Sequence, residues 1–175
     1  VLKSINRFSD SDFNLIKIFS IKSTSSLSSS LPIVSSRILF SRSTDQGETF
    51  SAPIQISKFL GDAKDGDSTV EGAVPCVSPK GKVYIAWTGP QGIVFTKSTD
   101  GGQTFADEKP VVKQVGGWTY AIPGIYRCNG LPFTDCDISE SDYRGTIYIN
   151  YSDSTNGDHD IFIIKSNDEG ETWSN

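Results

Sequence analysis

Several residue types that carry chemistry are scarce in this sequence. Its 175 residues contain no methionine, one histidine (His159) and three cysteines (Cys76, Cys128 and Cys136). A single histidine without a matching nucleophile motif argues against a Ser-His-Asp triad. An odd number of cysteines is not a disulfide framework, and no CxxC or Cys/His spacing indicates zinc. Cys128 and Cys136 could pair, with free or buried thiols as the alternative.

Long apolar runs and basic clusters are also missing. No stretch of 18 apolar residues exists, which argues against a membrane span. The net charge is −5 and the pI is about 4.8. Without a basic block, nucleic acid is not an expected partner. The chain starts with Val1 and shows no basic-then-apolar leader, so export cannot be read from the sequence.

One short pattern occurs three times: S-x-D-x-G-x-T followed by Phe or Trp. The copies are Ser43–Phe50, Ser98–Phe105 and Ser166–Trp173. Such spacing along the chain indicates a repeat architecture. The shared positions are Ser43, Asp45, Gly47, Thr49 and Phe50; Ser98, Asp100, Gly102, Thr104 and Phe105; and Ser166, Asp168, Gly170, Thr172 and Trp173.

Each repeated pattern has the chemistry of a hairpin tip. The Asp carboxylate can accept bonds from the backbone N–H groups that follow it, and the Gly supplies a positive φ. The Ser and Thr hydroxyls can tie the two arms together, and the aromatic residue is expected to pack under the turn. A short β-branched and aromatic run with a basic residue at its end precedes each copy, and these runs, at 37–42, 92–97 and 160–165, are predicted strands.

The remaining strands are predicted from short apolar runs between turn signals. No helix of useful length is expected. Residues 1–36 are the least specified part, with a strand at 13–22 and a Ser-rich loop at 23–36, and residues 59–72 are predicted to be a polar loop. The other predicted strands are 52–58, 73–78, 82–88, 110–115, 131–137 and 146–152.

The predicted unit is therefore a four-stranded meander with the repeated turn between its third and fourth strands. Such units arranged radially make a β-propeller. Residues 1–175 are interpreted as one partial, all-β propeller domain of about three blades. Residues 73–115 form a complete blade, an earlier blade carries 43–50, and 131–175 form an incomplete one. An open ring would leave strand edges exposed.

The repeated pattern resembles the Asp box, or bacterial neuraminidase repeat, of sialidases. The segments VEGAVPCVSPKGKVYIAWTGPQGIVFTKSTDGGQTF and IPGIYRCNGLP are also similar to bacterial sialidase-family proteins. This resemblance implies a six-bladed propeller that hydrolyses terminal sialic acids of glycoconjugates with retention. It also implies a secreted, periplasmic or cell-surface protein. The sequence departs from the family in lacking an Arg-Ile-Pro segment, which carries the family's first carboxylate-binding Arg.

In an up-and-down blade the loops between strands alternate between two ends, so the order of the strands assigns each loop to one end. The Asp boxes, interpreted as structural turns, share one end with the turns between first and second strands. The opposite end carries 59–72, 89–91, 116–130 and 153–159, which are the least strand-like segments. Because function usually lies on loops held by a rigid scaffold, the site is predicted at this opposite end.

The sialidase resemblance assigns roles to residues at that end. Arg127, and secondly Arg37, would clamp the sugar carboxylate, since a guanidinium matches it bidentately. Sialidases use a Tyr nucleophile, for which Tyr126 is the candidate, and Glu71 would take its proton. Asp67, or Asp62, would be the acid. Loop packing is the alternative for Tyr126 and a surface position for either Arg. The candidates for a sugar-stacking wall are Trp118 and Tyr120, with packing between blades as the alternative.

No cofactor is expected. The acidic set Asp62, Asp65, Asp67 and Glu71 could hold calcium, but its spacing is not that of an EF-hand, and a solvated loop is the alternative.

The sequence thus predicts part of an exo-α-sialidase acting on sialylated glycans. The runner-up is an Asp-box propeller that binds a glycan or protein without cleaving it, and the third is a glycoside hydrolase for another sugar. The 175-residue chain by itself is expected to be inactive and to associate, because its ring is not closed.

Overall fold

A computed structural model describes residues 2–7, 15–25, 33–64, 66, 68–114, 121–126 and 128–174, with backbone alone at 2–7, 15, 19–25, 33 and 34. The described residues contain strands and turns but no helix. Consequently none of them belongs to a helix that could cross a membrane.

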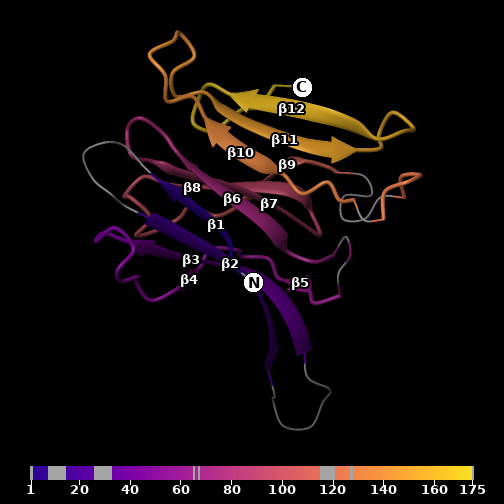
Figure 1. Cartoon of the computed structure of the whole chain (residues 1–175), viewed down its shortest axis with the longest axis horizontal. Coiled ribbons are helices and arrows are strands. Elements are labelled where there is room, and N and C mark those ends of the chain that lie inside the picture. The colour runs from indigo at the N-terminus through magenta and orange to yellow at the C-terminus, as the bar shows by residue number, and fades with distance from the viewer. Residues whose placement is uncertain are drawn as a thin grey trace.

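The strands form three antiparallel sheets that stack as successive layers (Figure 1). The first sheet has the order β1-β2-β3-β4, with β5 paired to β3, and the others run β6-β7-β8-β9 and β10-β11-β12. The strands are β1 (Leu2–Arg7), β2 (Leu15–Ser25), β3 (Ile33–Ser43), β4 (Ile54–Gln55), β5 (Gly61–Asp62), β6 (Glu71–Val77), β7 (Val83–Gly89), β8 (Gly92–Ser98), β9 (Lys109–Val112), β10 (Phe133–Cys136), β11 (Ile147–Asp153) and β12 (Asp160–Ser166). The all-β class is confirmed, and the seven strands β6–β12 lie within about three residues of their predicted bounds.

The Ser-rich prediction at 23–36 is wrong at both of its ends. Strands β2 and β3 run into it and pair Ser23 with Ser35 and Ser25 with Ile33. The hairpin therefore extends beyond the rest of the first sheet (Figure 1). Serine composition indicated a loop, but Thr24, Ile33 and Val34 are β-branched residues that favour a strand. Residues 26–32 lie outside the described residues.

Three other strands differ from the prediction. β1 was not expected. β4 covers only two residues of the predicted strand 52–58, because Pro53 has no N–H and Ser57 Oγ, rather than a backbone group, accepts the bond from Ile38 N at 3.0 Å. β5 lies inside the predicted polar loop 59–72.

The middle sheet is buried on both faces. All seven residues of β7 are buried, with Val83, Ile85 and Trp87 in the cluster shared with the first sheet. Tyr84 and Ala86 belong to the cluster shared with the third sheet. This is why β7 lacks an apolar/polar alternation: neither of its faces meets water. The two apolar layers fix the separation of the sheets, at about 10 Å for stacked sheets in general.

Candidate functional site

Each Asp box is a turn closed by its own side chains. In the second copy, Ser98 Oγ donates to Asp100 Oδ1 at 2.7 Å and accepts from Gly102 N at 2.8 Å. Thr104 donates to Asp100 from its backbone N at 3.0 Å and from its hydroxyl at 2.6 Å. The first and third copies repeat these four interactions. The Asp therefore organises the turn.

The same hydrogen bonds depress the pKa of each box carboxylate. Bonds from the Ser43 and Thr49 hydroxyls and from Thr49 N lower the pKa of Asp45 to about 2. At Asp100 the Thr104 hydroxyl is the largest cause and holds the pKa well below its usual value, and Thr172 does the same at Asp168. These residues remain ionised acceptors, which supports a structural role.

The Asp boxes also join successive sheets. A Cβ built on Gly102 would lie 2.7 Å from Phe40 Cζ, and one on Gly170 would lie 2.7 Å from Phe95 Cζ. Both glycines have a φ of 83°. The box glycine thus rests against an aromatic ring on the third strand of the preceding sheet, where a side chain would not fit.

Two further contacts connect each of these pairs of adjacent sheets. The box aromatic does not pack under its own turn alone: Phe105 meets Phe40 edge-on at 4.7 Å between ring centroids, and Trp173 meets Phe95 at 5.1 Å. A basic residue on the receiving strand donates to a box carbonyl. Arg42 Nη1 bonds Gly101 O, and Lys97 Nζ bonds Glu169 O, both at 3.1 Å.

Glutamates strengthen these connections. Glu108 is buried and accepts from Lys58 N at 2.5 Å and Phe59 N at 3.0 Å, which holds the crossing from the first sheet to the second. Between the second and third sheets, Glu169 pairs with Lys82 at 2.6 Å and Glu171 with Lys97 at 2.7 Å.

The opposite end of the sheets carries the segments predicted to hold the site, and they differ from one another. Asp62 Oδ1 accepts from Lys64 N and from Thr69 Oγ1, both at 3.1 Å, so its carboxylate closes a local turn. At the end of β11, the buried Asp153 accepts from Thr155 N and Thr155 Oγ1, both at 2.7 Å. Each segment therefore has its own internal bonding.

Gln114 connects this end of the second and third sheets. Its Nε2 donates to Gly130 O at 2.6 Å and to Ser152 O at 2.9 Å, and its Oε1 accepts from Thr88 Oγ1 at 3.0 Å. One side chain thus holds β7, the end of β11 and the loop before β10. The sequence analysis missed this residue, since a lone Gln after a strand carries no signal.

Two predicted site residues lie at this end on rigid elements. Glu71 begins β6, is half-buried and is paired across the ladder with Thr88, the hydroxyl partner of Gln114. Arg37 lies in β3, where its Nη2 donates to Ser35 Oγ at 3.0 Å and its Nη1 to Gln55 Oε1 at 3.3 Å. Ser35 is in turn the ladder partner of Asp62. Arg37 and Asp62 are thereby brought to the same part of the first sheet.

The remaining predicted site residues are not assembled by the described structure. Tyr126 is fully exposed, with a relative accessibility of 105%. Asp65, Asp67, Trp118, Tyr120 and Arg127 lie outside the described residues. Among the residues that are described, no three His, Cys, Asp or Glu side chains gather as a metal site. The calcium alternative remains a prediction.

The cysteines are thiols, which answers the question of a Cys128–Cys136 bond. All three are free. Burial raises the pKa of Cys76 well above its usual value and that of Cys136 to about 11. Both thiols therefore stay protonated and inert.

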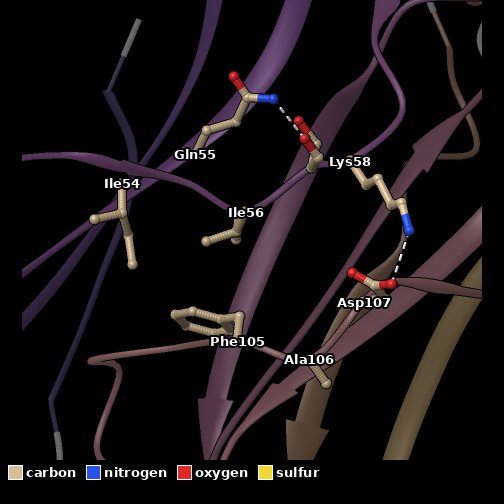
Figure 2. Close-up of a pocket in the computed structure, with 8 residues that line it drawn as sticks. Ile54, Gln55, Ile56, Lys58, Phe105, Ala106 and Asp107 are labelled. Carbon is tan, nitrogen blue, oxygen red and sulfur yellow. Dashed lines mark hydrogen bonds and ion pairs between the residues drawn. The ribbon is translucent and has the colours of Figure 1, made fainter.

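A shallow groove of about 380 Å³ lies between the first and second sheets, and its lining includes Gln55, the hydrogen-bond partner of Arg37. It is lined by 54–58, which are β4 and the three residues after it, and by 105–107, which are the last residue of the second Asp box and the two residues after it (Figure 2). Lys58 Nζ and Asp107 Oδ2 face each other across it at 2.8 Å. The groove therefore lies at the outer edge of the contact between the first and second sheets.

Comparison with known proteins identifies the fold. The chain is similar to the Hadza microbial sialidase Hz136, with a TM-score of 0.56 and 22% identity over 91% of this chain. It is also similar to a point mutant of the NanB sialidase from Streptococcus pneumoniae, with a TM-score of 0.58 and 15% identity over 94% of this chain. The chain spans 34% and 21% of the lengths of those two proteins. No protein-family model matches it, and no curated protein does. The three sheets are thus part of a sialidase-like β-propeller.

Proposed function

We propose that this chain is part of a glycoside hydrolase that removes terminal sialic acids from glycoconjugates outside the cytoplasm. The observation that carries the proposal is the fold it shares with two sialidases over nine-tenths of its length. The position of the half-buried Glu71 and Arg37 supports it, because both lie at the irregular end of the sheets. Ligands of propellers and other rigid β-scaffolds are commonly bound by such loops.

In the proposed reaction, Arg127 and Arg37 hold the carboxylate of the sugar, with Trp118 and Tyr120 beside its ring. The Tyr126 oxygen bonds to the anomeric carbon as the glycosidic bond breaks. Glu71 takes the phenol proton, and Asp67 protonates the departing oxygen. Water then displaces the tyrosine at the anomeric carbon and gives a proton to the Asp67 carboxylate, while Glu71 returns its proton to the phenol oxygen, and this second displacement gives retention. These steps use only protein groups and water.

A second candidate is an Asp-box propeller that binds a glycan or protein without cleaving it. The full exposure of Tyr126 favours this candidate, because a nucleophile needs a neighbouring base in contact.

Release of a fluorophore from an aryl sialoside separates the two candidates. The release should be measured with the 175-residue chain alone and with a longer polypeptide in which this chain forms part of a closed propeller. Hydrolysis by the closed ring, with none by the chain alone, is expected. A closed, folded ring that binds sialyllactose, followed by ligand-observed NMR, but releases no fluorophore would establish the binding function instead.

A further inference from the structure

The strand that carries Glu71 is irregular where it begins. In β6, Glu71 pairs with Thr88 but Val74 pairs with Ala86, so β6 advances three residues while β7 advances two. The extra residue makes a β-bulge, within which Gly72 has a φ of 76°. Such bulges bend a strand and re-aim a side chain. The direction of the Glu71 carboxylate therefore depends on what holds the bulge in place.

The bulge lies where two neighbouring sheets can reach it. β6 contacts β10 of the third sheet and β2 of the first, so it lies between them (Figure 1). β1 also has a register shift near its start, between Leu2 and Ser4, which makes an irregular first strand part of the repeat. The contacts on either side of Glu71, rather than the bulge alone, are therefore the features to consider.

The loop before the third sheet holds one side of the bulge. A Cβ built on Gly72 would lie 2.9 Å from Leu131 Cδ2 and 3.0 Å from Leu131 Cβ, so the Leu131 side chain rests directly on the Gly72 backbone. Leu131 follows Gly130, whose carbonyl accepts from Gln114 Nε2 at 2.6 Å. The same Gln114 accepts from Thr88 Oγ1 on β7 at 3.0 Å. Leu131 is thus kept against the bulge by a residue that is itself bonded to β7.

The first sheet holds the other side of Glu71. Val70 N donates to Ser36 Oγ at 2.8 Å, and these two residues are 1% and 0% exposed. The Val70 side chain belongs to the apolar cluster shared by the first and second sheets. A Cβ built on Gly89, at the end of β7, would lie 3.3 Å from Val70 Cγ2. A shift of Val70 would therefore break a buried hydrogen bond and open an apolar contact.

Ser36 also relates Glu71 to Arg37, the other candidate site residue on a rigid element. Ser36 precedes Arg37 in β3, and Val70 precedes Glu71. The bond from Val70 N to Ser36 Oγ therefore joins the residue before one candidate to the residue before the other. Because the two candidates lie on different sheets, this bond helps to fix their separation.

We propose that Leu131 and Ser36 are positioning residues for Glu71, and that together they fix the direction of its carboxylate relative to Arg37. This inference rests on the proposed function, in which Glu71 is the base and Arg37 holds the sugar carboxylate. Leu131 and Ser36 act through the backbone on either side of Glu71 and not by touching the substrate. A misplacement of about 1 Å in such a geometry can lower a rate by roughly 10²-fold.

Steady-state hydrolysis of an aryl sialoside by the closed propeller tests the Leu131 contact. Leu131→Ala removes most of the side chain that rests on Gly72 and should lower kcat roughly 10- to 100-fold, with KM within about threefold of wild type. Leu131→Met keeps the volume and should retain kcat within about threefold. The control Val77→Ala truncates a half-buried residue at the Asp-box end of the same strand and should leave kcat unchanged. A wild-type kcat in Leu131→Ala, or an equal loss in Val77→Ala, would overturn the proposal.

The Ser36 contact is tested alone and in combination. Ser36→Ala removes the acceptor used by Val70 N and should lower kcat roughly tenfold. It should also raise KM, because Ser36 adjoins Arg37. Since both contacts act on the position of Glu71, the double variant Ser36→Ala/Leu131→Ala should lose less than the product of the two single losses. Losses that multiply would show that the two residues act on separate groups and would contradict joint positioning.

Hydrogen exchange in the 175-residue chain gives a readout that needs no activity. Amide exchange across 70–74 should be at least about threefold faster in Leu131→Ala and in Ser36→Ala than in wild type, and unchanged in Val77→Ala. Unchanged exchange in both variants would refute the positioning of Glu71 even if the propeller hydrolyses sialosides. A wild-type propeller without hydrolysis would refute the proposed function instead, while faster exchange in the two variants would still support the hold of both sheets on Glu71.

Discussion

The two ends of the sheets are built on different principles. At the Asp-box end the same four hydrogen bonds recur in three turns, and the same three contacts join each described pair of adjacent sheets. At the opposite end, Asp62, Gln114 and Asp153 each make different bonds with different partners. Repetition therefore specifies how sheets are joined, and variation is concentrated at the end where the site is proposed.

The largest effect is expected where a box glycine meets the preceding sheet. Gly170→Ala combines a positive φ with overlap against Phe95 and should lower the free energy of unfolding by about 2–4 kcal/mol. The control Gly145→Ala has a φ of 89° but open space around its Cβ, and should cost only about 1–2 kcal/mol. Urea unfolding measures both. Equal losses would mean that the fit against Phe95 is unimportant.

A smaller loss is expected from the connection at the opposite end. Gln114→Met leaves the carbonyls of Gly130 and Ser152 without this donor and should cost about 1–3 kcal/mol. Amide exchange at Leu131 should also become faster. Gln103→Met removes an exposed bond to Asp100 O within a box and should change stability by less than about 0.5 kcal/mol. A larger loss of stability in Gln103→Met than in Gln114→Met would contradict the role assigned to Gln114.

Acid should weaken the Asp-box end first. The folded-state pKa of Asp45, about 2, lies below the unfolded value of 3.8, and Asp100 and Asp168 are lowered further. A depressed folded pKa stabilises the fold above pH 4, and this contribution is lost as the pH falls through the folded value. Stability should therefore decrease from pH 4 to pH 2. Asp100→Asn should flatten this decrease, whereas Asp142→Asn, outside the boxes, should not.

The smallest effect on stability is expected at the candidate catalytic residues. Glu71→Gln is nearly isosteric and should change the free energy of unfolding by less than about 1 kcal/mol. If Glu71 is the proposed base, sialoside hydrolysis by a closed ring should fall at least about 10²-fold. Full activity in this variant would remove Glu71 from the proposed mechanism while leaving the fold assignment intact.

Most of the fold could be predicted from local patterns. The strands from β6 to β12 follow short apolar runs between turn residues, and the Asp boxes mark their order. The first sheet was harder, because the serines near the connected ends of β2 and β3 indicated a loop and obscured the β-branched residues among them. Of the candidate site, Glu71 and Arg37 were placed at the predicted end, but Gln114 was not found, since its role depends on three segments distant in sequence.

By itself, the sequence determined the Asp-box turns, because their hydrogen bonds join residues no more than four positions apart. It also determined which end of each sheet is regular. Only the tertiary structure decided that the box glycine and aromatic residue rest on the preceding sheet, since Phe40 and Gly102 are far apart along the chain. For the same reason, the exposure of Ile161 and Ile163 could not be read from a run that resembles the buried strands. Burial depends on the neighbouring sheet, which the local sequence of a strand does not encode.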